Sequence, residues 1–264
     1  MNIKLKLICV LLLAIVSCNT DDLLLEPQSL VKSAEKIDIY VESGILNIKD
    51  ESVFWKLVEL NTKKTFDELK SWQDSLGFES FYSIYESIFS KYEIIVEGKN
   101  PIVELEQFRN DYKDFITMAT GTYDGLPDYS IKPVIDMLYA SVANANGLVK
   151  IGGKLIDAKS ISRLKSVDSC YKSTSTRRMW IDINRFTNGN IANAYVTHQK
   201  KVLFAWVSYK TQYYWELENP PFGYWYTPGD VSSGYTIVMP TGGTVYLRMW
   251  NRGVGESNSC TFVN

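Results

Sequence analysis

The chain contains a single histidine, His198, and this limits the hydrolytic chemistry available to it. Serine and cysteine hydrolases need an imidazole between the nucleophile and a carboxylate. His198 lies in the polar stretch Thr-His-Gln-Lys-Lys, which predicts a solvated position at a strand end or turn. One histidine and the few cysteines also provide too few ligands for a structural or dinuclear zinc site. We therefore predict no catalytic histidine, no metal and no cofactor.

Paired carboxylates are the remaining catalytic option, because glycoside hydrolases use two carboxyl groups whose separation is set by the fold. Glu216 and Glu218 are the best candidates, since they would share one strand face beside aromatic residues. Exposed strands also carry such charges to prevent aggregation, and we favour this second interpretation. Asp124 and Asp128 lie in the loop from Gly121 to Ser130 without the spacing of an EF-hand, so we predict a solvated loop there.

The densest group of binding-type side chains is aromatic, with Tyr213-Tyr214-Trp215 and Tyr224-Trp225-Tyr226 on either side of a Pro-Pro-Phe-Gly loop. Alternate residues of a strand face opposite sides, so one set of rings can fill the core while the other remains at the surface. Surface rings would provide a flat platform for sugar rings or for a protein partner. The alternative is cross-strand pairing that only stabilises the sheet. Our ligand-binding candidates are Tyr213, Trp215, Tyr224, Trp225 and Tyr226.

The stretch from Lys4 to Asp22 predicts export and lipid anchoring. Two lysines precede an apolar core, Leu7 to Val16, which is shorter than the roughly 20 residues of a transmembrane helix. Ile15-Val16-Ser17-Cys18 looks like a bacterial lipobox, which implies cleavage before Cys18 and acylation of that cysteine. The alternative is an ordinary signal peptide. Acyl chains would hold a soluble domain at a membrane. Asp21 and Asp22 resemble the acidic tract with which Bacteroidetes-type lipoproteins reach the outer face of the outer membrane.

After that processing, Cys170 and Cys260 are the cysteines left for a disulfide. Two cysteines that bracket one region of an exported protein favour a bond between them, which would stabilise the fold by about 4 to 5 kcal/mol through loop closure. The alternative is two buried free thiols. The bond would join the first strand of the C-terminal region to its last strand.

Apolar periodicity and turn residues predict the elements that position these groups. Helical patterns dominate before Cys170 and strand patterns after it, where the composition also changes from acidic to basic. The fold class is therefore α+β: a signal peptide at 1–17, a tether at 18–30, a helix-rich α+β domain with β-hairpins at 31–166, and an all-β, Ig-like sandwich of about seven strands at 167–264. The expected hairpins are at 37–48 and 148–157, and the expected helices at 50–60, 65–76, 78–96, 100–118 and 133–143.

Three stretches carry signatures of turns and helix caps: Gly44–Asp50, Leu76–Ser80 and Asn146–Gly152. Through these stretches and the order of its elements, the chain resembles an uncharacterised family of Bacteroidetes-type surface lipoproteins of gut bacteria. The likeness covers most of residues 30 to 160, with a looser match through His198–Lys201 and Trp206–Tyr209. The resemblance implies a lipoprotein of the outer membrane exposed at the cell surface, and it supplies no catalytic residues.

We therefore expect a non-catalytic, lipid-anchored surface protein that binds a glycan or a host or partner protein, as an adhesin does. Neither half of the chain is basic enough to predict nucleic-acid binding. The first alternative is a structural or assembly subunit of an outer-membrane complex, acting through the acidic helical half. The second is a carboxylate-dependent glycoside hydrolase.

Overall fold

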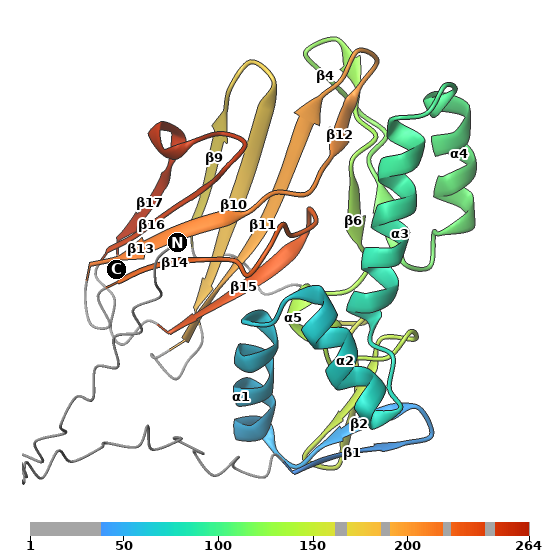
Figure 1. Cartoon of the computed structure of the whole chain (residues 1–264), viewed down its shortest axis with the longest axis vertical. Coiled ribbons are helices and arrows are strands. Elements are labelled where there is room, and N and C mark those ends of the chain that lie inside the picture. The colour runs from blue at the N-terminus through green and yellow to red at the C-terminus, as the bar shows by residue number, and fades with distance from the viewer. Residues whose placement is uncertain (1–37, 162–167, 186–190, 219–222, 241–245, 264) are drawn as a thin grey trace, which may run out of the picture. The chain divides into compact units, whose positions relative to one another are not determined.

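The structure is a computed structural model, and it describes residues 38–161, 168–185, 191–218, 223–240 and 246–263 (Figure 1). These residues belong to one compact unit, 37–264. The signal peptide, the tether and Cys18 lie outside the described residues, as does the predicted domain boundary at 166/167, and these stay predictions. In the described part of the chain, no helix combines the length and apolarity needed to cross a membrane.

The two predicted hairpins are confirmed, and they associate in one sheet. The first consists of β1 (Ile39–Glu42) and β2 (Ile45–Ile48), the second of β7 (Leu148–Ile151) and β8 (Lys154–Asp157). Strand β2 pairs in parallel with β7, so the sheet order is β1-β2-β7-β8. In the first turn, Ser43 and Gly44 both have positive φ, 52° and 72°, as a two-residue hairpin turn of type I′ requires.

Local capping signals define most of the helices. Helix α1 (Glu51–Thr62) begins after Asp50, whose carboxylate accepts a hydrogen bond from the Val53 N–H. Helix α2 (Phe66–Leu76) has the complete capping box formed by Thr65 and Glu68, and it ends at Gly77 in the left-handed conformation. Helix α3 (Phe81–Val96) is capped by Ser80. These three helices confirm the sequence predictions.

The two later helices are shorter than predicted. Helix α4 (Pro101–Asp111) ends before residues 116–118, which form β3 (Ile116–Met118) instead. Strand β3 pairs with β6 (Ile131–Pro133), so the expected helix start at Pro133 is the end of a strand, and helix α5 occupies only Met137–Ala140. The helical periodicity of 100–118 was therefore wrong over its last turns, because pairing with a distant strand overrides a local apolar pattern.

The described residues from 168 onward form two antiparallel sheets. The first has the order β12-β11-β10-β9, with β15 also paired to β11, and the second has the order β14-β13-β16-β17. The α+β class is thus observed. Ig-like connectivity is not confirmed, because the consecutive strands β9, β10 and β11 are neighbours in one sheet. The strand bounds are β9 Asp168–Ser173, β10 Arg177–Arg185, β11 Ile191–Lys201, β12 Trp206–Ser208, β13 Tyr213–Leu217, β14 Gly223–Tyr226, β15 Tyr235–Pro240, β16 Tyr246–Asn251 and β17 Cys260–Val263.

The predicted disulfide is confirmed. Cys170 in β9 is bonded to Cys260 in β17, and their Cα atoms are 5.9 Å apart. These two strands are at the edges of different sheets. The bond therefore joins the two β-sheets, in addition to closing a loop between residues 90 positions apart.

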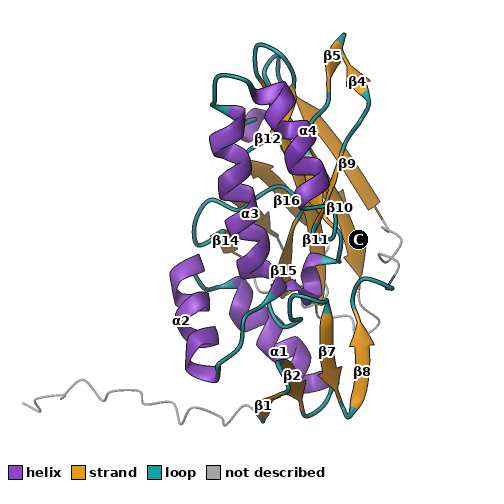
Figure 2. Cartoon of the chain, turned by 90° about the vertical axis from the view of Figure 1, so that its right-hand side faces the viewer, coloured by secondary structure: helices purple, strands orange, loops and turns teal. Residues whose placement is uncertain are grey.

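The helices and the sheets share one hydrophobic core. Helix α3 lies in front of the strands in Figure 2. Its tyrosines Tyr85 and Tyr92 are buried. The Tyr85 hydroxyl donates to the Ser233 carbonyl at 2.6 Å, and the Tyr92 hydroxyl donates to the Tyr129 carbonyl at 2.9 Å and accepts from the Ser208 N–H at 3.0 Å. Because these buried groups satisfy one another, the helical and β-rich parts depend on each other for stability.

Candidate ligand-binding site

The predicted aromatic candidates are divided between two faces of the sheet β14-β13-β16-β17. Strand β13 alternates, so Tyr213 and Trp215 face inward and are 0% and 8% exposed. On β14, Trp225 packs against the core, whereas Tyr224 and Tyr226 on either side of it point outward. Trp225 also covers Gly223, where an added Cβ would lie 2.6 Å from the ring. Tyr213, Trp215 and Trp225 are therefore core side chains in this structure.

The outer face of the same sheet carries the remaining candidates. Tyr224 is 54% exposed and Tyr226 is 59% exposed. Both lie beside Tyr214, with ring centroids 6.3 and 6.4 Å from its own. Tyr214 in turn stacks on the buried Trp250, with centroids 5.8 Å apart and planes 18° from parallel. We call Tyr214, Tyr224, Tyr226 and Trp250 the tyrosine face.

A charged rim adjoins the tyrosine face on β16. The Arg248 guanidinium lies 5.1 Å from the Trp250 ring centroid and pairs with the carboxylates of Glu216 at 3.6 Å and Glu256 at 3.1 Å. Glu216, a predicted catalytic candidate, is thus held in an ion pair, while Glu218 is exposed just beyond the end of β13. Flat rings next to paired charges can stack on a sugar and form hydrogen bonds with its hydroxyl groups.

The expected surface position of His198 was wrong. Its side chain is 0% exposed and lies between the two sheets, with Nδ1 3.1 Å from the Tyr213 hydroxyl and the ring edge-on to Tyr209. Burial lowers the pKa of His198 to about 3, so the imidazole is neutral near pH 7. The polar neighbours Thr197 and Gln199 misled the sequence interpretation, because they occupy the opposite face of the same strand, β11.

A cleft of about 510 Å³ lies on that opposite face, which the sequence did not indicate. Its floor is the outer face of β10 and β11, and its walls come from residues between 117 and 132, including β4 (Thr122–Tyr123), which forms a short hairpin with β5 (Leu126–Pro127). Ser208 holds this segment against β12, since its hydroxyl accepts from the Ile131 N–H at 3.1 Å and donates to the Ile131 carbonyl at 3.2 Å.

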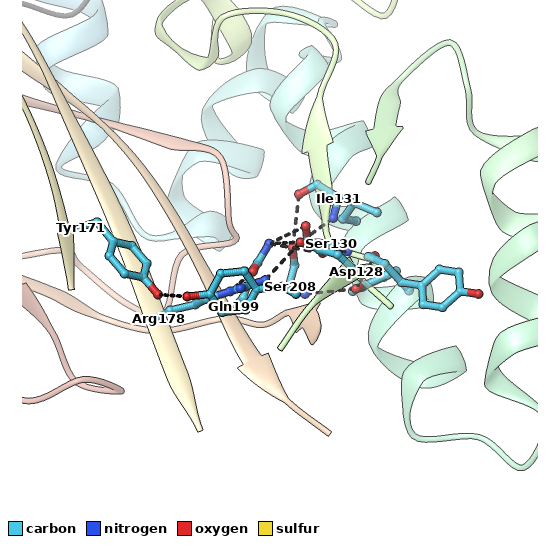
Figure 3. Close-up of polar contacts among 10 residues, drawn as sticks. Asp128, Ser130, Ile131, Tyr171, Arg178, Gln199 and Ser208 are labelled. Carbon is cyan, nitrogen blue, oxygen red and sulfur yellow. Dashed lines mark hydrogen bonds and ion pairs between the residues drawn. The ribbon is translucent and has the colours of Figure 1, made fainter. Parts of the chain in front are cut away.

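The central group of the cleft is Arg178, which is only 1% exposed. The Tyr123 and Trp206 ring centroids lie 3.9 and 4.1 Å from the guanidinium carbon. Nη2 donates to Asp128 Oδ2 at 3.1 Å, and Nε donates to Gln199 Oε1 (Figure 3). Nη1 has no hydrogen-bond partner among the described residues.

Side chains around Asp128 complete this network. Gln199 Nε2 donates to the Ser130 hydroxyl at 2.5 Å and approaches both Asp128 oxygens at 3.3 and 3.4 Å (Figure 3). Asp128 Oδ1 also accepts from the Ser130 N–H at 2.9 Å. The loop that was expected to be merely solvated therefore contributes a carboxylate to a structured polar site. No group of three or more His, Cys, Asp or Glu suited to a metal occurs in the described ranges.

Comparison with known proteins gives little further information. No protein-family model matches the chain, and no curated protein matches it. A crystal structure of a DUF4848 family protein from Bacteroides thetaiotaomicron is similar over 85% of this chain and 98% of that chain, with 19% identity and a TM-score of 0.41. These values are too low to assign the chain to a family or to transfer a function. The Bacteroidetes-type lipoprotein family stays a prediction.

Proposed function

We propose that the chain is a lipid-anchored, non-catalytic cell-surface protein that binds a glycan through the tyrosine face. The observation that carries this proposal is the exposure of Tyr224 and Tyr226, each of which is more than half accessible to solvent. Both residues lie beside Tyr214 on the outer face of the sheet. Each of these two rings contacts its aromatic neighbours along one side only, and a pyranose ring can cover the side that remains exposed to water.

The surroundings of the tyrosine face support a sugar as the ligand. Glu216 and Arg248 are directly opposite each other on β13 and β16, and Glu216 is also opposite Tyr224 on β14. Carboxylate and guanidinium groups therefore lie next to the rings, where they can accept from and donate to sugar hydroxyl groups. Contact with its neighbours desolvates Tyr224 slightly and, together with Tyr214, raises its pKa, so the phenol is a neutral hydrogen-bond donor near pH 7, as an ordinary tyrosine is.

The rest of the chain would display the tyrosine face at the cell surface. Acylation of Cys18 would fix the protein to the outer membrane, and the residues that follow would separate the folded unit from the lipid. An Ig-like sandwich whose two sheets are joined by the disulfide between Cys170 and Cys260 would hold the tyrosine face rigid. A rigid scaffold lowers the entropy lost when a ligand binds.

The test is a glycan-array screen of the full chain in a detergent without a sugar head group, followed by titration of any glycan that binds. The double substitution Tyr224→Ala/Tyr226→Ala should weaken binding by about tenfold or more. The matched control is Tyr40→Ala, because Tyr40 is also exposed, at 58%, but lies on β1. Equal affinity of the double variant and the control would refute the tyrosine face as the binding surface. Cleavage of a bound glycan would instead favour the glycoside-hydrolase hypothesis.

A second candidate function is an assembly subunit that binds another outer-membrane protein. The observation that favours it is a pair of exposed apolar side chains that line the same surface hollow: Val103 on α4 and Leu203 between β11 and β12. Such exposed groups often contact a partner. In-cell cross-linking should then yield a heteromeric species that Val103→Lys abolishes. An unchanged species in that variant, or no species at all, would reject this candidate.

A further inference from the structure

We infer that the cleft above β10 and β11 is a second binding site, and that it takes one neutral sugar residue or a similar small polyhydroxylated molecule. The cleft belongs to the other β-sheet and shares no residue with the tyrosine face, so the inference stands independently of the proposed function. Its volume of about 510 Å³ lies within the range of about 300 to 1,000 Å³ that is common for small-molecule pockets.

The floor of the cleft presents polar groups in fixed register. Arg178 is paired with Gln199 across β10 and β11, and the next outward-facing pair along the strands is Trp180 with Thr197. All four side chains line the cleft. A site on paired strands is held more precisely than one on loops, which is a requirement for recognising the positions of individual hydroxyl groups.

Arg178 supplies an incompletely used donor. Stacking between Tyr123 and Trp206 fixes the plane of the guanidinium, and Asp128 and Gln199 take the N–H groups of Nη2 and Nε. Nη1 is buried and has no hydrogen-bond partner among the described residues. A buried N–H without an acceptor is costly, so an oxygen atom from a ligand would stabilise this arrangement.

The charge of the cleft favours a neutral ligand. Two cationic side chains, Arg178 and Lys132, and two carboxylates, Asp128 and Asp182, line it in the described part of the chain. Arg178 already has a carboxylate partner at 3.1 Å. A ligand carboxylate or phosphate would add an uncompensated negative charge next to Asp128, which desolvation makes unfavourable.

A hydroxyl group fits the remaining requirements. It can accept from Arg178 and donate to the partly exposed carboxylate of Asp128, which is adjacent. Trp180 on the floor and Tyr123 on the wall provide aromatic surface for the apolar face of a sugar ring. A guanidinium, a carboxylate and aromatic rings around one cavity therefore match a molecule with several neighbouring hydroxyl groups.

The experiment is saturation-transfer NMR titration of the full chain, in a detergent without a sugar head group, with glucose, galactose, mannose and N-acetylglucosamine. Glucuronate and inorganic phosphate are titrated in parallel. The blocking variant is Gly121→Phe, because Gly121 lines the cleft and an added Cβ there meets no atom within 4 Å. The matched control is Gly229→Phe, since Gly229 is equally open but lies outside the cleft.

We expect saturable binding of at least one neutral sugar, weakened by about tenfold or more in Gly121→Phe and unchanged in Gly229→Phe. Binding should also be unchanged in Tyr224→Ala/Tyr226→Ala, which separates this site from the tyrosine face. Titration with the methyl glycoside of the sugar that binds, and with trisaccharides that end in it, then shows whether the cleft takes a free sugar or the end of a glycan. Absence of neutral-sugar binding, full binding in Gly121→Phe, or tighter binding of glucuronate or phosphate would overturn the inference.

Discussion

Burial of the single histidine predicts a specific loss of stability in mild acid. In the folded protein the pKa of His198 is lowered to about 3 by burial, compared with an ordinary value of 6.5. Between these values the unfolded chain binds one more proton than the folded chain, so this contribution to stability is complete above pH 6.5 and is lost as the pH falls. The slope is about 1.4 kcal/mol per pH unit, which gives a loss of about 2 kcal/mol between pH 7.5 and pH 5.

The assay compares urea unfolding of the full chain and of His198→Gln at these two pH values. Glutamine does not titrate, and the contribution of carboxylates is common to both proteins, so the stability difference between them isolates His198. We expect that difference to change by about 2 kcal/mol in favour of the variant at pH 5. Because there is one histidine, its single imidazole NMR signal provides an independent check. A titration midpoint near 6.5 in the folded protein would refute its burial between the sheets.

Four further predictions concern anchoring and stability. Cys18→Ala should release the protein from the membrane fraction; retention there would exclude the lipid anchor. In urea without reductant, neither Cys170 nor Cys260 should react with a thiol reagent, and replacing both by serine should cost about 4 kcal/mol of stability. Trp225→Ala should lower the melting temperature clearly, since the ring packs against the core. An unchanged melting temperature would show that the Trp225 ring lies at the surface. Thr65→Ala should cost about 1 kcal/mol in urea unfolding, because it removes the capping box of α2.

The elements that could be predicted are those whose causes lie within a few residues. The cap at Asp50, the capping box at Thr65 and the C-terminal Gly77 act over one helical turn, so α1 and α2 could be predicted from their own residues. Helix α3 was predicted from its apolar spacing, which is equally local. The two hairpins were found for the same reason, since their turn residues adopt the required conformations locally. The pairing of Cys170 with Cys260 could be predicted because they are the two cysteines left after the predicted export processing.

The candidate site could be predicted only in part. Strand alternation indicated correctly that the aromatic residues divide into two sets, but not which set faces outward. That choice depends on which face of β13 and β14 packs against the other sheet, and Tyr213 became a core residue because His198 lies opposite it. Trp250, the buried member of the tyrosine face, comes from β16, which is distant in sequence from the aromatic cluster at 213–226.

The Arg178 cleft is decided entirely by tertiary structure. Asp128 is 50 residues before Arg178 in the chain, and Gln199 is 21 residues after it. The sequence drew attention to Asp128 only as a loop carboxylate, and no motif connects it with Arg178 or Gln199. The wall of the cleft exists because β3 pairs with β6 and Ser208 binds Ile131, contacts that also ended the predicted helix early. Caps, turns and alternation depend on neighbours along the chain, whereas burial, charge pairing and cavities depend on which distant segments pack together.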